Sequence, residues 1–377
     1  ALMAPTEVLA RQHFKTIDPL AKKIGLKADL LTGRDKGKAR ESILSQLKTG
    51  ATKIIIGTHA LFQESVIFQD LGLAVIDEQH RFGVHQRLML GAKGKVPVDI
   101  LVMTATPIPR TLMMSCYSDL DSSRLLEKPA GRKPIETRVV PIERINSVID
   151  RLKIAIRSGA RVFWICPLVD ENEVMDLAAA TNREDDLERH FPGSVALLHG
   201  QMKSKEKEEA MQRFSNGEAQ LLVSTTVVEV GVDVPEAGIM VIEHAERFGL
   251  AQLHQLRGRV GRGDQNSSCV LLYASPLNQT ARERLEIIRN TEDGFVIAEE
   301  DLRLRGAGEI LGTRQSGLPD YKLANLSEHR DLLEAARKDS QLILEKDPML
   351  TTPRGEALKI LLYLFERDAV VQTIQSG

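Results

Sequence analysis

The 377-residue chain is 42% hydrophobic and 27% charged, with a formal net charge of −2, which is an ordinary composition for a folded protein of two or three domains. The near-neutral charge excludes a surface coated in positive charge, although a local basic groove is enough to bind nucleic acid. The three cysteines, Cys116, Cys166 and Cys269, form no CxxC pair. This argues against a disulfide framework or a zinc site and fits a reducing cytoplasm. No apolar run is long enough to span a membrane, and the first ten residues lack the charged start of a signal peptide.

Strand-like runs alternate with longer segments in the first third of the chain. These runs are Lys53–Thr58, Leu73–Glu78 and Ile100–Thr106. Alternation of this kind indicates βαβ units and therefore a parallel sheet. A stretch rich in Pro and charge follows from Leu126 and is predicted to be a linker over residues 127–138.

The same pattern restarts after the predicted linker. A helix with a Gly stop is expected in the segment that starts at Met202, and helices take over from about Pro276. The predicted fold is α/β, with parts at 1–126, 127–138, 139–275 and 276–377: a first parallel-sheet lobe, the linker, a second lobe and a mainly helical C-terminal domain. The strands expected in the second lobe are Ala160–Val169, Ser194–Gly200, Ala219–Val234, Ile239–Glu243 and Ser268–Tyr273.

Polar side chains gather where the predicted strands of the first lobe end. Thr58 follows one strand, Asp77 and Glu78 end another, and Thr104 and Thr106 end a third. One reading is helix capping, because Asp and Thr accept backbone N–H bonds at helix starts. The other reading is a ligand or metal site, since open α/β sheets bind ligands at the carboxyl ends of their strands.

An arginine- and glycine-rich segment, "QLHQLRGRVGRG" from Gln252 to Gly263, stands out in the second lobe. Glycine lets the backbone approach a ligand, and arginine offers a planar fork that suits phosphate. A solvated or nucleic-acid-facing basic patch is the alternative reading. Together with the acidic pair, this segment predicts phosphoryl transfer. Asp77 would hold Mg²⁺ and Glu78 would orient the attacking water, facing Arg259 and Arg262 across a cleft.

Six segments resemble, in order, the motifs of superfamily 2 helicases, whose two lobes are RecA-like. They are "APTEVLARQH" (Ala4–His13), "GTHAL" (Gly57–Leu61), "DEQH" (Asp77–His80), "TATPIPRTL" (Thr104–Leu112), "STTVVEVGVDVPEA" (Ser224–Ala237) and "QLRGRVGR" (Gln255–Arg262). The segment Gly294–Leu326 is similar to one shared by the RecG family and the transcription-repair coupling factor. Its wording "LRGAGEILGTRQSGLPD", with the tail after it, is closer to the RecG family.

The resemblance implies ATP and Mg²⁺ as cofactors, with Asp77 on the metal and Glu78 on the hydrolytic water. Arg259 and Arg262 would be arginine fingers. Gly231, Asp233 and Gln255 would line the nucleotide site from the second lobe.

Further roles follow from the same resemblance, all at matching positions of this sequence. Thr6, Gly33, Thr58 and Thr225 would touch the DNA backbone without reading sequence. The residues that would couple hydrolysis to lobe closure and DNA movement are Gln79, His80, Thr104, Thr106, Arg284, Arg305 and Gln315. The family remodels stalled forks and branch-migrates Holliday junctions, so branched double-stranded DNA is the expected partner. A single-strand-binding protein is a further candidate, and a cytoplasmic, nucleoid-associated location without any membrane is expected.

One family motif is missing from the sequence. No G-x-x-x-x-G-K-[ST] loop occurs, although "GRDKGKAR" (Gly33–Arg40) and "GAKGKVPV" (Gly91–Val98) have Gly and Lys at other spacings. The chain also starts at Ala1 inside an apolar run, and a wedge domain is absent. We expect a truncated C-terminal motor, with the loop about one βαβ unit, roughly thirty residues, upstream. Such a fragment should hydrolyse ATP poorly and have a first lobe of low stability.

Two alternatives remain open on the sequence alone. A translocase of the coupling-factor type would act on stalled RNA polymerase. A helicase relic would bind DNA without catalysis, but its acids and arginines would then have no nucleotide to serve.

Overall fold

The structure is a computed structural model that describes residues 1–78, 93–105, 107, 109, 121–129, 131–167, 173–225, 234, 236–263, 266–311 and 329–365. Side chains at 173–179, 204, 305–311 and 330 are outside this description. The chain divides into two compact units, the first made of 1–122 and 305–377 and the second of 123–304. Each unit is described separately below.

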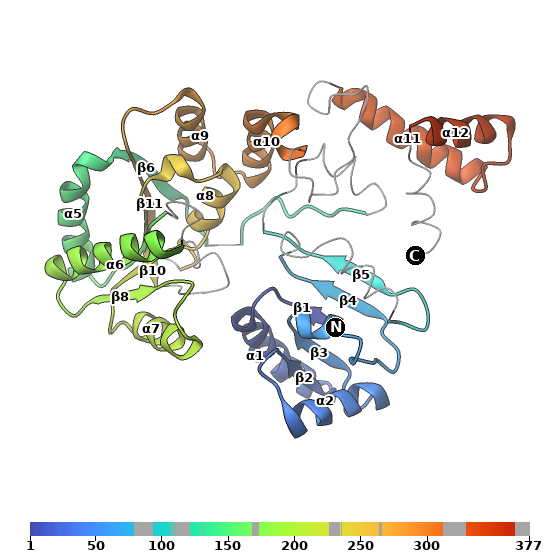
Figure 1. Ribbon diagram of the computed structural model, residues 1–377, viewed down its shortest axis with the longest axis horizontal. Coiled ribbons are helices and arrows are strands. Elements are labelled where there is room, and N and C mark those ends of the chain that lie inside the picture. The colour runs from blue at the N-terminus through green and yellow to red at the C-terminus, as the bar shows by residue number, and fades with distance from the viewer. Residues whose placement is uncertain are drawn as a thin grey trace. The chain divides into compact units, whose positions relative to one another are not determined.

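The first unit contains a five-stranded parallel sheet in the order β2-β3-β1-β4-β5 (Figure 1). β1 is only two residues long, yet it lies at the centre of the sheet, pairing Met3 with Gly57 on one side and with Ile76 on the other. The strands are β1 (Leu2–Met3), β2 (Ala28–Leu31), β3 (Ile54–Gly57), β4 (Leu73–Ile76) and β5 (Asp99–Val102).

Two helices and a 3₁₀ turn accompany this sheet: α1 (Glu7–Lys23), α2 (Gly37–Thr49) and η1 (His59–Phe62). Thr6 caps α1, because its side chain accepts the N–H of Leu9. Gly50 ends α2 in the left-handed conformation that glycine adopts without strain. The core consists of small and branched apolar side chains, including Met3, Leu31, Leu61 and Ile76, none of which is exposed.

The second unit contains a six-stranded parallel sheet in the order β6-β11-β10-β7-β9-β8. Its strands are β6 (Ile135–Pro141), β7 (Arg161–Ile165), β8 (Val195–Leu198), β9 (Leu221–Ser224), β10 (Ala237–Ile242) and β11 (Ser267–Tyr273). The helices are α5 (Ile145–Arg157), α6 (Glu173–His190), α7 (Ser204–Asn216), α8 (Leu250–Arg257) and α9 (Gln279–Asn290), with turns η3 (Ile142–Arg144) and η5 (Ala245–Arg247).

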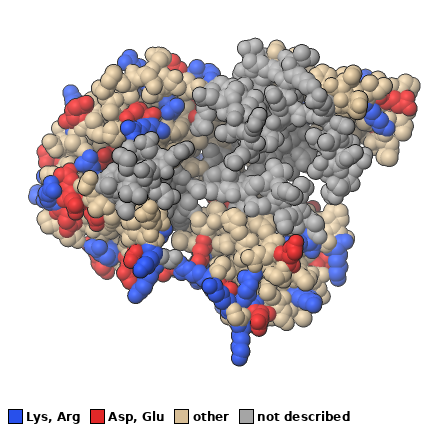
Figure 2. Space-filling view, in the orientation of Figure 1, with Lys and Arg blue, Asp and Glu red and all other residues tan. Residues whose placement is uncertain are grey.

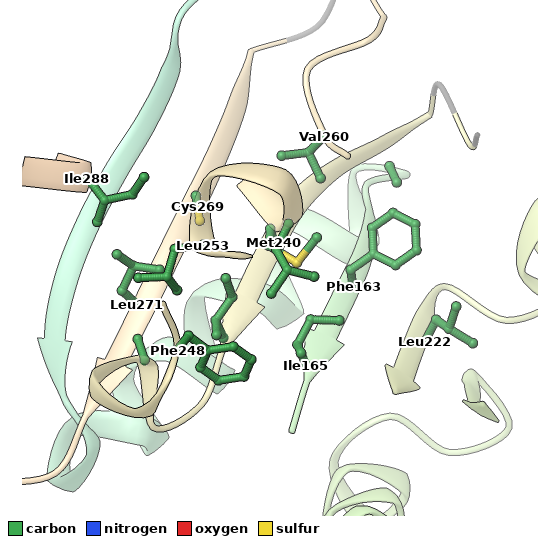
Figure 3. Close-up of a cluster of buried hydrophobic side chains, with 14 of the residues drawn as sticks. Phe163, Ile165, Leu222, Met240, Phe248, Leu253, Val260, Cys269, Leu271 and Ile288 are labelled. Carbon is green, nitrogen blue, oxygen red and sulfur yellow. The ribbon is translucent and has the colours of Figure 1, made fainter. Parts of the chain in front are cut away.

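One apolar cluster of the second unit connects the sheet to α8 and the segment after it. Figure 3 shows Leu253 of α8 and Val260 of the following loop beside Met240 and Cys269 of the central strands. All four side chains are fully buried. Apolar burial of this kind stabilises by about 25 cal/mol per Å², so the segment after α8 is anchored by its own Val260.

The last part of the chain is helical, with α10 (Gly294–Leu311), α11 (Arg330–Lys346) and α12 (Pro353–Leu364). Asp347 links α11 to α12, accepting hydrogen bonds from the backbone N–H and hydroxyl groups of Thr351 and Thr352. The predicted fold class, two parallel-sheet α/β lobes followed by a helical region, is confirmed. No helix within the described residues is long and apolar enough to cross a membrane.

The structure differs from the sequence prediction at three strands. β2 was not predicted, because Asp29 interrupts the apolar run of "ADLL". β6 starts at Ile135, so residues 135–138 of the predicted linker belong to the sheet; Pro and charge pointed to a linker, but the alternating residues of 135–140 pair with β11. β9 ends at Ser224, whereas the prediction extended it to Val234 over residues that are partly outside the described ranges.

Candidate functional site

The carboxyl ends of the first sheet bring the predicted residues of the first lobe to one edge. Because the strands are parallel, the segments that follow them lie along this edge in the order of the strands. Gly33 follows β2, Thr58 follows β3, Thr6 follows β1, Asp77 follows β4 and Thr104 follows β5. The predicted DNA contacts therefore occupy three neighbouring strands and the predicted nucleotide-side residues the other two.

Asp77 is held on both carboxylate oxygens. Its Oδ1 accepts the backbone N–H of Glu78 at 3.0 Å, and its Oδ2 lies 2.8 Å from Nε2 of His13 on α1. The backbone N–H of Asp77 donates to the carbonyl of Met3 at 2.9 Å, which continues the β1–β4 pairing beyond the strand. Glu78 is half-buried and has a φ of 54°, in the left-handed region that non-glycine residues rarely adopt. A helix that this pair could cap would begin at residues 79–92, which lie outside the described residues, so the capping reading stays open.

The chemistry of the acidic pair suits a magnesium ion. No group of three or more His, Cys, Asp or Glu side chains gathers in the described part of the chain. Mg²⁺ is commonly held by one or two carboxylates together with phosphate oxygens and water. The Asp77 side chain is 20% exposed, and each of its oxygens keeps a second lone pair after the bonds to His13 and to the Glu78 N–H.

Positive charge is concentrated in the segment that contains α1 and α2, beside the half of the edge with the predicted DNA contacts. Residues 7–49 hold ten Lys or Arg against five Asp or Glu. Figure 2 shows blue Lys and Arg side chains over the part of this unit that contains α1 and α2. Glu7, at the start of α1, pairs with Arg34 beside Gly33 at 2.9 Å. The loop after β2 is closed by Asp35, which accepts the backbone N–H of Thr32 at 2.7 Å.

In the second unit, the predicted arginine fingers lie in a tightly held loop after α8. Arg259 is half-buried and Arg262 is exposed. Gly261 has a φ of 76°, and a Cβ there would meet the Ile135 side chain at 3.0 Å, so both backbone shape and space require glycine. The loop thus presents its arginines from a backbone that rests on β6.

Arg257, which sequence reasoning left without a role, ties α8 to the end of α9. It is 2% exposed, and its Nη1 donates to the carbonyls of Ile288 and Thr291 at 2.5 and 2.9 Å. Burial lowers the pKa of Arg257, and burial followed by the nearby Arg257 and Lys128 charges lowers that of His254 to about 4. A buried cation so placed fixes the segment that leads into the arginine loop.

The segment before β6 also contacts the arginine loop, which the linker prediction did not foresee. Arg132 donates from Nε to the carbonyl of Gly261 at 3.2 Å and from Nη2 to that of Gly258 at 3.4 Å. Lys128 pairs with Glu292, which also accepts the backbone N–H of Ile135. These residues are part of the second unit rather than a free connection.

Arg284, predicted to couple hydrolysis to movement, is placed on α9. Its Nη1 donates to the carbonyls of Glu246 and Phe248, at 3.2 and 3.0 Å, just before α8 starts. Arg284 therefore attaches the segment before α8 to α9, and Arg257 attaches the last turn of α8 to the end of α9. Gln255 lies within α8, three residues before the start of the loop.

The structure describes only some of the remaining predicted residues. Thr225, predicted to touch DNA, is 3% exposed at the end of β9, and its carbonyl accepts the hydroxyl of Ser224. Arg305 lies in α10, but its side chain is not described. Gln79, His80, Thr106, Gly231, Asp233 and Gln315 lie outside the described residues.

A polar cavity of about 570 Å³ opens at the carboxyl ends of β7 and β10, which the sequence reasoning did not anticipate. Its floor is the carboxylate of Glu243, 5% exposed, which accepts hydrogen bonds from the indole N–H of Trp164 and from Arg183. The residues that line the cavity lie on α6 and after β7 and β10, and the arginine loop is not among them. The buried carboxylate of Glu243 is neutralised by Arg183 within the same unit.

Comparison with protein families matches three of them along the chain. DEAD/DEAH box helicase matches residues 1–115, the helicase conserved C-terminal domain matches 143–264, and the C-terminal part of domain 3 of the ATP-dependent DNA helicase RecG matches 291–371.

Curated relatives and solved structures agree with these matches. ATP-dependent DNA helicase RecG of Haemophilus influenzae is 50% identical over 92% of this chain, and that of Escherichia coli K12 is 48% identical over 92%. The chain spans about half the length of these relatives, 51% in both. A structure of RecG bound to a three-way DNA junction matches with a TM-score of 0.68 and 42% identity, covering 88% of this chain and 43% of that one.

A more distant structure, yeast Dbp5 bound to RNA and ADP BeF3, matches with a TM-score of 0.54 at 13% identity and covers 90% of this chain and 80% of that chain. At that identity it speaks for the fold alone. The relatives near 50% identity and the RecG-specific match at 291–371 show the family as well as the fold. The chain belongs to the RecG family of ATP-dependent DNA helicases.

Proposed function

We propose that this chain is the motor part of an ATP-driven translocase that acts on branched double-stranded DNA. The observation that carries the proposal is Asp77, a carboxylate fixed on both oxygens at the carboxyl end of β4, in a chain about half identical to RecG helicases. A parallel sheet with such a carboxylate at its edge suits a nucleotide-bound Mg²⁺. The junction-bound RecG structure supports branched DNA as the substrate.

The proposed chemistry divides the residues into two sets that serve one ATP. Asp77 binds Mg²⁺ and Glu78 orients the hydrolytic water, while Arg259 and Arg262 neutralise charge on the γ-phosphate. Gln255 supports the nucleotide from α8. Gly231 and Asp233 are proposed for the same site.

DNA contact and coupling make up the rest of the proposal. Thr6, Gly33 and Thr58 share one half of the first edge, and their hydroxyl and backbone N–H groups suit phosphate contacts that carry no sequence information. Thr225 is proposed as a contact through the same chemistry. The proposed coupling residues are Gln79, His80, Thr104, Thr106, Arg284, Arg305 and Gln315.

We keep four functional parts as the proposed organisation: 1–126, 127–138, 139–275 and 276–377. They are a first lobe, a linker that packs as part of the second unit, a second lobe and a coupling region. A cytoplasmic, nucleoid-associated location and a single-strand-binding protein partner complete the proposal; co-precipitation with that protein tests the partner.

Hydrolysis also needs a phosphate-binding loop of the G-x-x-x-x-G-K-[ST] type, which the printed sequence does not contain. The test therefore uses the product of the complete reading frame. ATP hydrolysis is measured with and without DNA, and unwinding is measured on synthetic forks, Holliday junctions and linear duplexes. We expect DNA-dependent hydrolysis and remodelling of the branched substrates. DNA binding without hydrolysis would instead support a relic, and removal of stalled RNA polymerase without fork remodelling would support the coupling-factor type.

Glu78→Gln is the sharpest variant for this test. The amide keeps the shape of the side chain but loses its charge, so hydrolysis should fall by about 10²–10⁴-fold while ATP and DNA binding persist. Glu64→Gln, in the loop after η1, is the matched control and should hydrolyse normally. Native turnover in Glu78→Gln would remove Glu78 from the proposed mechanism.

A further inference from the structure

The carboxyl edge of the first sheet has a boundary between its two halves. Segments after β2, β3 and β1 hold the proposed DNA contacts, and segments after β4 and β5 hold Asp77 and Thr104. β1 and β4 are neighbours in the sheet, so the boundary falls between them. α1 starts directly after β1, on the DNA side of this boundary.

The first turn of α1 is joined to the proposed DNA surface. Thr6 caps the helix, and Glu7 bridges to Arg34 in the loop after β2. The Arg34 side chain is 46% exposed, so a DNA phosphate at this loop would compete with Glu7 for its guanidinium. Phosphate binding at the loop therefore acts on the start of α1.

His13 lies on the same face of α1 as Thr6, because seven residues make about two helical turns. Its Nε2 reaches across the boundary to Oδ2 of Asp77 at 2.8 Å, and its side chain is 27% exposed. The other oxygen of Asp77 accepts the N–H of Glu78. With both oxygens bonded, the carboxylate cannot rotate without breaking one of these bonds.

We propose that His13 is a positioning residue: it holds Asp77 in the orientation that binds Mg²⁺ and transmits to it the effect of DNA phosphate bound at the start of α1. The inference rests on the proposed function, since it needs both the metal and the DNA sites. Partners that hydrogen-bond a metal-binding carboxylate typically change metal affinity or activity by about 10- to 100-fold when removed. The alternative is that the His13–Asp77 hydrogen bond only holds α1 against the end of β4.

The test compares His13→Ala, His13→Gln and Thr16→Ala in the product of the complete reading frame. Gln places an amide nitrogen near the position of the His13 Nε2 atom and is the conservative variant. Thr16 is exposed one turn further along α1, and Thr16→Ala is the matched control. Binding of Mn²⁺ to the ADP-loaded protein is measured by electron paramagnetic resonance, and ATP hydrolysis is measured with and without a duplex oligonucleotide.

We expect His13→Ala to weaken Mn²⁺ binding by about 10- to 100-fold and to reduce the stimulation by DNA. Metal-free ADP binding and DNA affinity should stay native. His13→Gln should recover part of both losses, and Thr16→Ala should behave as the native protein. A purely structural role predicts lower stability in His13→Ala with native Mn²⁺ affinity, and that result overturns the proposal. Weaker Mn²⁺ binding with native DNA stimulation overturns the coupling role.

A second readout uses the 377-residue chain itself. With ¹⁵N-labelled histidine, the ring nitrogens of His13 should change their chemical shifts in Asp77→Asn and on addition of the duplex oligonucleotide. If the duplex binds and the chemical shifts of the His13 ring nitrogens do not change, transmission through α1 is contradicted. Failure of the native protein to hydrolyse ATP or bind Mn²⁺ would instead mark failure of the proposed function. Native activity with an indifferent His13 would mark failure of this inference alone.

Discussion

The acidic pair of the first unit and the arginine loop of the second are supported in different ways. Asp77 and Glu78 come at the end of a four-residue strand, and Asp77 contacts the His13 ring and backbone groups next to the strand. The arginine loop is attached to α9 by Arg257, to the segment before β6 by Arg132 and to the core by Val260.

This difference indicates a division of labour between the two regions. The second unit builds its loop from buried, mutually supporting contacts, which should keep the arginines ready without ligand. Asp77 of the acidic pair is bonded to a half-buried side chain of the neighbouring helix α1. In the proposed function, a bond of this kind suits a site that responds to DNA. The predictions below test this contrast.

The largest effect is expected from the arginines themselves. In the product of the complete reading frame, Arg259→Ala and Arg262→Ala should each lower ATP turnover by about 10³-fold, because each would remove charge proposed to stabilise the transferring phosphoryl group. Unfolding of the second unit should be unchanged, since the loop is held by other residues. Arg289→Ala, on the exposed face of α9, serves as the control. A stability loss in Arg259→Ala would show that the loop is not independently supported.

The second largest effect is expected from Arg257, which acts through structure. Arg257→Ala leaves the carbonyls of Ile288 and Thr291 without their buried donor and should cost about 2–4 kcal/mol of unfolding free energy. Trp164 is the only tryptophan and is fully buried in the second unit, so its fluorescence during urea unfolding reports this unit. A native unfolding midpoint in this variant would contradict the proposed support of the loop.

The pH dependence of the second unit is expected to reveal His254. Burial, followed by the Arg257 and Lys128 charges, lowers its pKa to about 4, whereas an unfolded histidine titrates near 6.5. The unfolded state therefore binds the extra proton first, so stability is complete above about pH 6.5 and declines as pH falls toward 4. Between pH 7 and 5 the loss should be about 2 kcal/mol.

The comparison of the native chain with His254→Gln isolates this effect from other titrating groups. Trp164 fluorescence in urea at several pH values provides the measurement. The difference in unfolding free energy between the two chains should shrink as pH falls. A constant difference from pH 7 to 4 would mean that His254 is not held neutral.

The smallest effect is expected from Arg132, which supports the loop through two long hydrogen bonds. Arg132→Ala should raise the KM for ATP or lower kcat about fivefold, the equivalent of about 1 kcal/mol. The neighbouring exposed Lys133→Ala should leave both constants unchanged. Equal effects of the two variants on turnover would assign the loss to lost charge rather than to the loop carbonyls.

Much of this architecture could be predicted from the sequence, and the reasons for the exceptions are physical. Alternating apolar runs revealed both sheets, and the order of motifs indicated Asp77, Glu78, Arg259 and Arg262. The supporting residue His13 could not be found this way, because its partner is 64 positions away and only the β1–β4 adjacency brings them together. Arg257 was likewise hidden: the sequence shows an arginine in a basic loop, whereas packing against α9 makes it a buried cation.

The linker prediction shows the same limit from the opposite side. Pro and charge at 127–138 predicted a linker between the two sheets, whereas Lys128, Arg132 and Ile135 all make specific contacts within the second unit. Local composition reports what a segment can do alone. Which carbonyls an arginine such as Arg132 reaches depends on the tertiary fold.

The left-handed backbone at Glu78 implies that selection for stability and selection for ATP turnover favour different residues at this position. A non-glycine residue with a φ of 54° gives up roughly 1–2 kcal/mol. A library ranked only by thermal resistance should therefore enrich Gly or Asn at 78 and discard the acid. Selection for stability alone would therefore yield well-folded but inactive variants if Glu78 has its proposed role, so position 78 has to be held constant before stability is improved elsewhere.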